Sequence, residues 1–242
     1  MPDVIVCCVK WGAKYPPLYV NRLCSMVGRH LSQPHRFVCL TDHPNGFDPR
    51  IETIALPKGL AGYWNKISLF KAGLLPAGAT IVYLDLDVVI VGPIHFLLDD
   101  PGGLVVIREW GRASGAYNSS VMRFEAGEHA FVFDSFYPGA AEIVGSGRYV
   151  GDQDWIAEQA PQAKSFPKGK IVSYKRDLGS HALPLAKSLR LDFLLKAPRF
   201  MTVSPTPGAA IVVFHGKPDP EDVMDSSYGP WKRAPFVKQH WR

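Results

Sequence analysis

The sequence predicts an α/β fold in which helices flank a mostly parallel central sheet. Apolar, β-branched runs alternate with segments of helical period through the first third of the chain, as in strand–helix–strand units. The connections between these runs are long enough for crossovers, which pair strands in parallel. The chain has 242 residues, of which 47% are hydrophobic, so it can form one substantial domain with a full core.

Three early strands are expected, each closed by a polar or turn-forming group. Residues 4–9 end at Lys-Trp-Gly, residues 37–40 end at Thr-Asp and a Pro-Asn-Gly turn, and residues 51–56 alternate in polarity. Because ligands bind at the carboxyl ends of parallel strands, Lys10 and Asp42 fall where a site is expected. Further short strands are expected at 104–108, 121–124 and 211–214.

Helices are expected where apolar residues recur every three or four positions. Residues 17–30 and 63–75 show this spacing, and the second segment carries Lys66. Later helices are expected at 128–136, from Asp152 to just before Pro161 and, with weaker periodicity, at 185–195.

The run at residues 81–91 is apolar except for Asp85 and Asp87, and it predicts one strand buried on both faces. Residues i and i+2 of a strand point to the same side, so the two carboxylates are expected to converge. Buried carboxylates need a counter-charge, and a hard divalent cation such as Mg²⁺ or Mn²⁺ suits oxygen ligands. The alternative is a strand end whose Asp residues cap a turn or pair with a lysine.

Charge is distributed unevenly along the chain, whose net charge is +5. Residues 1–163 hold 13 Lys and Arg against 16 Asp and Glu, whereas residues 164–242 hold 14 against 6. This asymmetry favours an anionic partner for the C-terminal third, such as a phosphorylated small molecule or an anionic membrane surface. No zinc-finger or aromatic RNA-binding pattern supports a nucleic-acid partner.

The N-terminal residues and the cysteines favour a cytoplasmic location. The first residues lack the basic region and cleavage site of a signal peptide, and no apolar run is long enough to span a bilayer. The four cysteines (Cys7, Cys8, Cys24 and Cys39) lack metal-ligand spacing and are expected to be buried free thiols.

Two more polar groups lie next to apolar strands. Asn118 belongs to a polar, Gly-containing segment at 111–120, and His215-Gly216-Lys217 follows the strand at 211–214. Glycine lets a backbone approach a ligand closely, and a lysine supplies a point charge for phosphate. Two carboxylates with one histidine suit Mn²⁺. The alternative is a structural His215.

Four motifs, in this order, resemble those of GT-A fold glycosyltransferases. They are Tyr-Leu-Asp85-Leu-Asp87, Tyr-Asn118-Ser-Ser-Val, Asp152-Gln153-Asp154 and Phe-His215-Gly-Lys217-Pro. The resemblance is to retaining enzymes of the glycogenin and lipopolysaccharide-galactosyltransferase type, and it covers about residues 3–220. It implies a GT-A, Rossmann-like sheet with a small acceptor-side subdomain. It also implies hexosyl transfer from a nucleotide-sugar, expected to be a UDP-sugar, to a glycan or lipid-linked acceptor.

The same resemblance implies a metal and phosphate site. Asp85, Asp87 and His215 would hold Mn²⁺ or Mg²⁺, which bridges the diphosphate of the donor. Lys217 and Gly216 would contact the phosphates. A divalent cation and a lysine would together stabilise the charge of the leaving diphosphate.

Other positions would bind the rest of the donor. Lys66 stands where the family has a basic residue on the helix before the Asp strand. The end of the first strand, from Val9 to Tyr15, would hold the uracil ring, and Asn118 would line the donor sugar.

The triplet Asp152-Gln153-Asp154 carries the implied catalytic residues. Asp152 and Gln153 would lie near the anomeric carbon of the donor. An inverting enzyme also needs a carboxylate base on the acceptor hydroxyl, for which Asp152 and Asp154 are available. The retaining and inverting routes stay open. The alternative is that acids in a first helical turn complement the helix dipole.

The sequence is also compatible with two other functions. The Asp pair also resembles the first motif of haloacid-dehalogenase phosphatases, with Asp85 as phosphoryl-accepting nucleophile and Asp87 as acid/base. A non-catalytic protein that binds a nucleotide-sugar is the other alternative. Stabilisation by UDP in the presence of Mn²⁺, but not by a phosphate monoester, separates these classes.

The chain is expected to form one catalytic domain with three functional parts. Residues 1–92 would bind the nucleotide, residues 93–220 would bind donor sugar and acceptor, and residues 221–242 would form a basic aromatic tail. Interleaved rings and cations in the tail suit peripheral contact with the inner face of an anionic membrane. The alternative is that the tail packs on the domain, with Trp231 and Trp241 in the core.

Overall fold

The computed structural model describes residues 3–99, 102–108, 110, 117–191 and 196–242. They form two compact units that interleave along the chain. The first comprises Met1–Cys24, Gln33–Leu86 and His95–Phe166, and the second comprises Ser25–Ser32, Asp87–Ile94 and Pro167–Arg242. These units do not correspond to the three functional parts expected from the sequence (residues 1–92, 93–220 and 221–242). That functional division stays a prediction.

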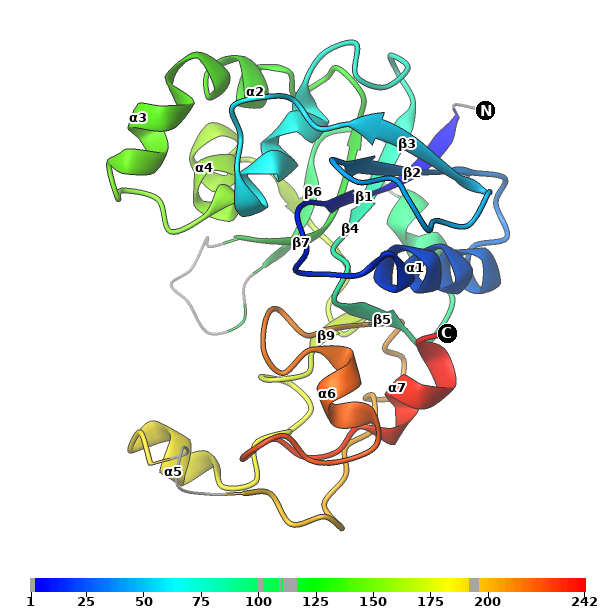
Figure 1. Ribbon diagram of the computed structural model, residues 1–242, viewed down its shortest axis with the longest axis vertical. Coiled ribbons are helices and arrows are strands. Elements are labelled where there is room, and N and C mark those ends of the chain that lie inside the picture. The colour runs from blue at the N-terminus through cyan, green and yellow to red at the C-terminus, as the bar shows by residue number, and fades with distance from the viewer. Residues whose placement is uncertain (1–2, 100–101, 109, 111–116, 192–195) are drawn as a thin grey trace. The chain divides into compact units, whose positions relative to one another are not determined.

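The first unit is built on a seven-stranded sheet of order β3-β2-β1-β4-β7-β6-β8 (Figure 1). Strands β1 to β4 pair in parallel, β7 pairs antiparallel with β4 and β6, and β8 pairs in parallel with β6. This confirms the expected α/β fold with a mostly parallel sheet. The strands are Val4–Lys10 (β1), Arg36–Thr41 (β2), Ile51–Ala55 (β3), Thr80–Leu84 (β4), Val105–Arg108 (β6), Tyr117–Glu125 (β7) and Lys164–Ser165 (β8).

The strand order creates a switch point beside β1. From β1 the chain runs outward to β2 and β3, and it then returns to pair β4 with the other side of β1. Ligands bind at the carboxyl ends of the strands that flank such a point. Lys10 ends β1, and Asp42 and Asp85 directly follow β2 and β4, so the expected placement of these three residues at one sheet edge is confirmed.

Helices occupy the segments between the strands. The expected helix at 17–30 is confirmed, whereas the helix expected at 63–75 is a 3₁₀ helix that ends at Phe70. Lys71 leaves it in an extended conformation (φ −62°, ψ 123°), and Gly73 has a φ of 74°, so the chain turns away. The helices begun in this unit are Pro17–His30 (α1), Gly62–Phe70 (η1), His95–Leu98 (η2), Phe131–Asp134 (α2), Tyr137–Gly139 (η3), Ala140–Gly145 (α3) and Asp152–Gln159 (α4).

Aromatic packing fixes η1 in the first unit. Helix η1 contacts α2 and α4, and α4 lies on β7 (Figure 1). Trp64 of η1 stacks on Phe136 with ring centroids 5.2 Å apart, and Phe136 meets Trp155 of α4 edge-on at 5.3 Å. These contacts hold the whole stretch from Trp64 to Phe70 in the interior, which places Lys66 among buried side chains.

The prediction of one strand across residues 81–91 is wrong. Strand β4 ends at Leu84, and the following strand β5 (Val88–Ile90) belongs to a different, three-stranded sheet. The Asp85 amide still donates to Ser120 O of the first sheet at 2.8 Å, whereas Asp87 O accepts from Phe214 N of the second unit at 3.1 Å. Asp85 and Asp87 therefore do not lie in one continuous strand, so strand alternation does not place their side chains on the same face.

Within the described residues, the second unit contains that smaller sheet and several short helices. Strand β10 (Ile211–Val213) lies between β5, which is antiparallel to it, and β9 (Ile171–Ser173), which is parallel. The helices are Pro184–Ser188 (α5), Pro220–Met224 (α6) and Pro235–His240 (α7), of which α6 and α7 pack together. Residues 111–116 of the expected polar segment and 192–195 of the expected weak helix lie outside the described residues.

The cysteines agree with expectation, because Cys7, Cys8, Cys24 and Cys39 are free and buried. For the tail, the packing alternative holds for Trp241, which is 2% exposed, whereas Trp231 is half-buried. Phe236 of the tail is also buried, at 6% exposed. No helix in the described ranges is long and apolar enough to cross a membrane.

Candidate active site

A buried charge cluster lies at the carboxyl end of β4 in the first unit. Lys66 Nζ is 3.1 Å from Asp85 Oδ1, 3.4 Å from Asp152 Oδ2 and 3.0 Å from Ser119 Oγ. Ser119 Oγ donates to Asp152 Oδ2 at 2.6 Å, and the Tyr83 hydroxyl donates to Asp85 Oδ1. Lys66 and Asp152 are each 5% exposed, so the ammonium bridges two carboxylates away from bulk water.

The electrostatics of the cluster keep Lys66 charged. Burial opposes its charge, but Asp152 and Asp85 outweigh that effect and raise the pKa of the ammonium. Burial raises the pKa of the Asp152 carboxyl, against the lowering effects of Lys66 and Ser119. Burial and the nearby Asp85 carboxylate raise the pKa of Tyr83, so its phenol stays protonated and donates. The cluster therefore gathers two carboxyl groups around one ammonium.

Two members of the cluster, Tyr83 and Ser119, were missed by the sequence analysis. Tyr83 precedes Asp85 by two positions, so the alternation of β4 already pointed to it. Ser119 lies on β7, which pairs antiparallel with β4. No local pattern links Ser119 to Lys66, because 53 positions separate them.

The loop after β1 is held by hydrogen bonds that cross to β2. Lys10 Nζ donates to Gly12 O at 3.0 Å, and Gly12 N lies 2.9 and 3.1 Å from the carboxylate oxygens of Asp42. Gly12 has a φ of 52°, a conformation that suits glycine. Val9 is buried in β1, and the Tyr15 ring packs on Tyr19 at 4.6 Å.

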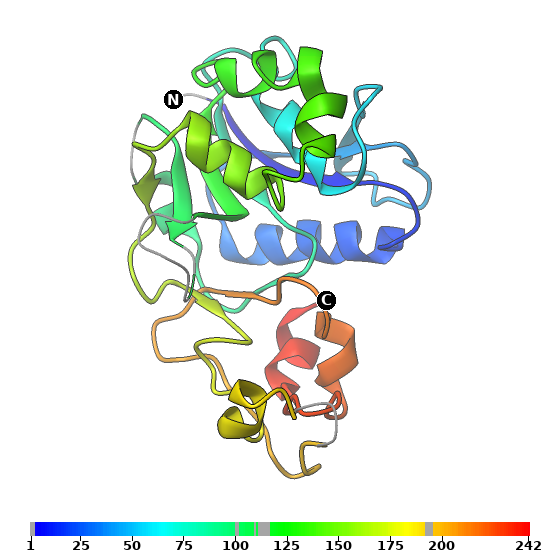
Figure 2. The same ribbon diagram turned by 90° about the vertical axis from the view of Figure 1, so that its left-hand side faces the viewer.

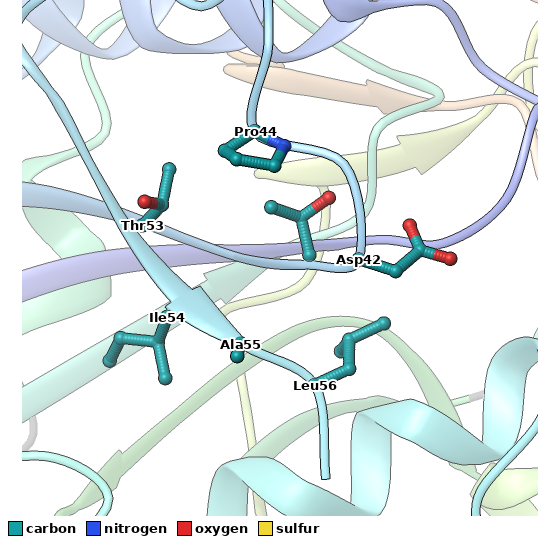
Figure 3. Close-up of a pocket in the computed structure, with 7 residues that line it drawn as sticks. Asp42, Pro44, Thr53, Ile54, Ala55 and Leu56 are labelled. Carbon is teal, nitrogen blue, oxygen red and sulfur yellow. The ribbon is translucent and has the colours of Figure 1, made fainter. Parts of the chain in front are cut away.

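A small cavity of about 260 Å³ adjoins this loop at the ends of β2 and β3. Figure 3 shows Pro44, Thr53, Ile54 and Leu56 around it. Its walls are mainly apolar, and the cavity is smaller than typical ligand pockets. The residues of the charge cluster are not among those that line the cavity, so the two features are separate.

Asn118, Gln153 and Asp154 are the other predicted donor-site and catalytic residues of the first unit. Asn118 is buried in β7, and its Oδ1 accepts from Ser120 N at 3.0 Å. Asp154 accepts from Val150 N, which precedes α4, at 2.8 Å, and both Asp152 and Asp154 lie in the first turn of the helix, where acids complement its dipole. Gln153 is half-buried in the same turn.

In the second unit, Asp87 and His215 lie around one glycine. Gly216 N donates to Asp87 Oδ2 at 3.0 Å, and Ser173 Oγ lies 2.6 Å from His215 Nε2. His215 has a φ of 39°, in the left-handed region that costs a histidine energy, and Gly216 follows at 81°. Burial, followed by Lys175, lowers the pKa of His215 to about 4, so its imidazole is neutral at pH 7.

Two lysines near His215 have different partners. Lys175 Nζ donates to His215 O at 3.0 Å and to Gly216 O at 2.9 Å. Lys217 Nζ instead lies 2.9 Å from both Asp219 and Asp222. Burial lowers the pKa of Lys175 to about 8, against the raising effect of Asp87, so it remains a cation at neutral pH. No sequence signal points to Lys175, because it belongs to none of the four motifs.

The predicted metal ligands fit a divalent cation in their chemistry. Asp85 belongs to the first unit, and Asp87 and His215 belong to the second. Within the described residues, no three His, Cys, Asp or Glu side chains are already gathered as a metal cluster. The ligand types are nevertheless suitable, because divalent ions bind carboxylates and neutral imidazoles, and the His215 imidazole is neutral at pH 7. The ligand set stays a prediction.

Comparison with solved structures identifies the architecture. The galactosyltransferase LgtC, solved with donor and acceptor sugar analogues, aligns with a TM-score of 0.64 at 13% identity over 98% of this chain and 94% of its own. GlyE from Streptococcus pneumoniae TIGR4 aligns at 0.65 and 13% identity over 93% of this chain and 58% of its own. The bifunctional glycosyltransferase WbbM aligns at 0.60 and 11% identity over 93% and 48%. The chain has the GT-A fold.

Sequence comparison does not relate this chain to known proteins. No protein-family model matches it, and no curated protein sequence matches it either. The GT-A fold that the four motifs implied is confirmed by structure, at identities too low to carry substrate or mechanism.

Proposed function

We propose that this protein is a metal-dependent glycosyltransferase that moves a sugar from a nucleotide-sugar, preferably a UDP-sugar, to a glycan or lipid-linked acceptor. The observation that carries the proposal is the Lys66–Asp85–Asp152 cluster in the first unit. It lies at the carboxyl end of β4, beside the switch point of a GT-A sheet. Such a position binds nucleotides in doubly wound sheets, and the carboxyl oxygens gathered there are the ligand type that a hard divalent cation prefers.

In this proposal Asp85, Asp87 and His215 hold Mn²⁺ or Mg²⁺. The ion would supply Lewis-acid stabilisation of the leaving diphosphate. The protein side contributes the neutral imidazole of His215 and the side-chain oxygens of Asp85 and Asp87. Tyr83 and Lys66 both contact Oδ1 of Asp85 and so fix the orientation of this carboxylate.

The proposed donor site has three parts. The β1 end, from Val9 to Tyr15, holds the base, and its conformation is supported by the bonds from Gly12 to Asp42. Asn118, Asp152 and Gln153 line the donor sugar. The salt bridge to Lys66 and the bond from Ser119 keep Asp152 in one orientation, which suits a residue that positions a sugar hydroxyl.

The hydrogen bonds of Asp152 and Asp154 bear on whether sugar transfer inverts or retains the configuration of the donor sugar. Asp152 Oδ2 and Asp154 Oδ2 each accept hydrogen bonds within the protein. An inverting enzyme requires one of these acids to accept the acceptor's proton, so those bonds would have to be shared or exchanged. The fold favours transfer over the phosphatase alternative, since it aligns with three glycosyltransferase structures over 93% or more of this chain.

Thermal stability tests the proposal directly. We expect UDP with Mn²⁺ to raise the melting temperature, because a ligand that binds only the folded state stabilises it by mass action. Calorimetry against UDP-, GDP- and CMP-sugars with Mn²⁺ then identifies the donor. Stabilisation by a phosphate monoester but not by UDP would instead support the phosphatase alternative, and nucleotide-sugar binding without turnover would support the binding protein.

A second test separates the two lysines near His215. An ammonium has three N–H donors, and Lys175 uses two of them on described acceptors. We propose that the third binds a donor phosphate, beside the expected contact from Lys217. Lys175→Met should weaken UDP binding about tenfold or more, as expected for loss of a charge-assisted bond, and leave uridine binding unchanged. Lys217→Met is the matched variant. A loss confined to Lys217→Met would show that Lys217 alone binds the phosphates.

A further inference from the structure

Residues 183–191 and 196–200 of the second unit, here called the α5 segment, expose an unusual number of apolar side chains. Five of the twelve exposed large apolar residues in the described part of the chain fall within it. They are Leu183 (50% exposed), Leu185 (73%), Leu189 (62%), Leu191 (45%) and Phe200 (81%). A concentration of this kind marks an interaction surface, whereas single exposed apolar residues need no explanation.

The helix of this segment stands away from the other helices of its unit. Figures 1 and 2 both show α5 apart from α6 and α7, which pack together. The exposed leucines are therefore not the outer edge of a shared helical core.

Cations interleave with these apolar residues. Arg190, Lys196 and Arg199 are exposed, and none of the three forms an ion pair with another described residue. Across residues 183–200 the sequence has four Lys and Arg and a single acid. The segment therefore offers positive charge and apolar surface together.

The C-terminal tail differs from this segment in its burial. Its rings Phe236 and Trp241 are 6% and 2% exposed, and Lys238 pairs with Asp225 at 2.9 Å. The sequence leaves membrane contact and packing on the domain as alternatives for the tail, and Phe236 and Trp241 are used in packing within the unit.

We propose that the α5 segment, rather than the tail, binds the surface of an anionic lipid bilayer. Its leucines and Phe200 would enter the interface, while Arg190, Lys196 and Arg199 would meet lipid phosphates. A second copy of the chain fits the same surface less well, because a two-fold contact would bring identical cations together. The inference does not depend on the proposed transferase activity, since its readout is lipid binding.

Vesicle flotation with the full chain tests it, using phosphatidylcholine alone or with 30% phosphatidylglycerol. We expect binding to the anionic vesicles only. Each cation near an anionic leaflet strengthens binding about fivefold, so Arg190→Gln/Lys196→Gln/Arg199→Gln should weaken it on the order of a hundredfold. The matched control, Lys58→Gln/Lys168→Gln/Lys170→Gln, removes the same charge from other exposed positions and should retain most of the binding.

An apolar variant tests the other half of the surface. Leu185→Asn/Leu189→Asn/Phe200→Asn should abolish flotation, and Phe131→Asn/Val144→Asn/Val150→Asn, which changes exposed apolar residues of the first unit, should not. Circular dichroism confirms that each variant is folded.

Four results would overturn the proposal. They are no binding to either vesicle, equal binding to both, equal losses in the control variants, or a loss confined to Lys238→Gln/Arg242→Gln in the tail. A fifth result would come from sedimentation velocity. If the protein does not float but forms a dimer that the apolar variant disrupts, the segment binds a second copy of the chain and not lipid.

Discussion

Replacing Asp87 by Asn should reduce sugar transfer by on the order of a thousandfold while leaving the protein folded. A group that stabilises developing charge in a transition state typically contributes an effect of this size. Asn keeps an oxygen that can accept from Gly216 N, the bond that Asp87 Oδ2 makes at 3.0 Å. The substitution therefore removes the charge of the proposed metal ligand and preserves the local hydrogen bond.

The measurements are turnover with saturating Mn²⁺ and calorimetry of UDP with Mn²⁺. Asp225→Asn is the matched control, because this acid of the same unit is 58% exposed and, within the described part of the chain, forms its salt bridge with Lys238. Both variants should melt within a few degrees of the parent. Full turnover in Asp87→Asn would remove Asp87 from the proposed metal site.

Replacing Lys66 by Met should lower the free energy of unfolding by about 3–5 kcal/mol. Removing one partner of a buried ion pair leaves an uncompensated charge, which carries a cost of this size. Here two carboxylates, Asp85 and Asp152, would lose their shared ammonium. Lys71→Met, one position beyond η1 and exposed, is the control and should change stability little. Urea unfolding of both variants measures the difference.

The loss in Lys66→Met should depend on pH in a defined direction. Burial raises the pKa of Asp152, and Lys66 is the strongest influence that lowers it, so the variant raises this pKa further. An acid with a raised folded-state pKa stabilises the protein below its unfolded-state pKa, and this stabilisation is lost as pH rises through the folded value. The deficit should therefore shrink from pH 7 toward pH 5. A second change, Asp152→Asn, should recover part of it at pH 7, and a pH-independent deficit without such recovery would show that Lys66 and Asp152 are not coupled.

The sequence was sufficient to predict one edge of the central sheet. Lys10, Asp42 and Asp85 end or follow β1, β2 and β4, and parallel strands necessarily bring their carboxyl ends to the same edge. Period and turn signals locate those ends along the chain, so no tertiary information was needed. The order of four weak motifs added the GT-A fold.

Other features depend on contacts between distant segments. Period alone could not show that the run at 81–91 divides between two sheets, because both halves are equally apolar and buried. The partners of Lys66 are Asp85, which follows β4, Ser119 of β7 and Asp152 of α4. The number of residues between these positions does not tell how far apart they lie in space.

The sequence by itself determined the alternation of strands and helices, the edge where their polar ends meet, and the excess of cations in the C-terminal third. Only the tertiary structure decided which of those cations are engaged and which apolar residues are exposed. Lys217 is paired with acids, Lys175 contacts the carbonyls of His215 and Gly216, and Phe200 is exposed while Trp241 is buried. The physical reason is that burial and pairing are properties of a side chain's neighbours in space, and those neighbours come from parts of the chain that no local pattern connects.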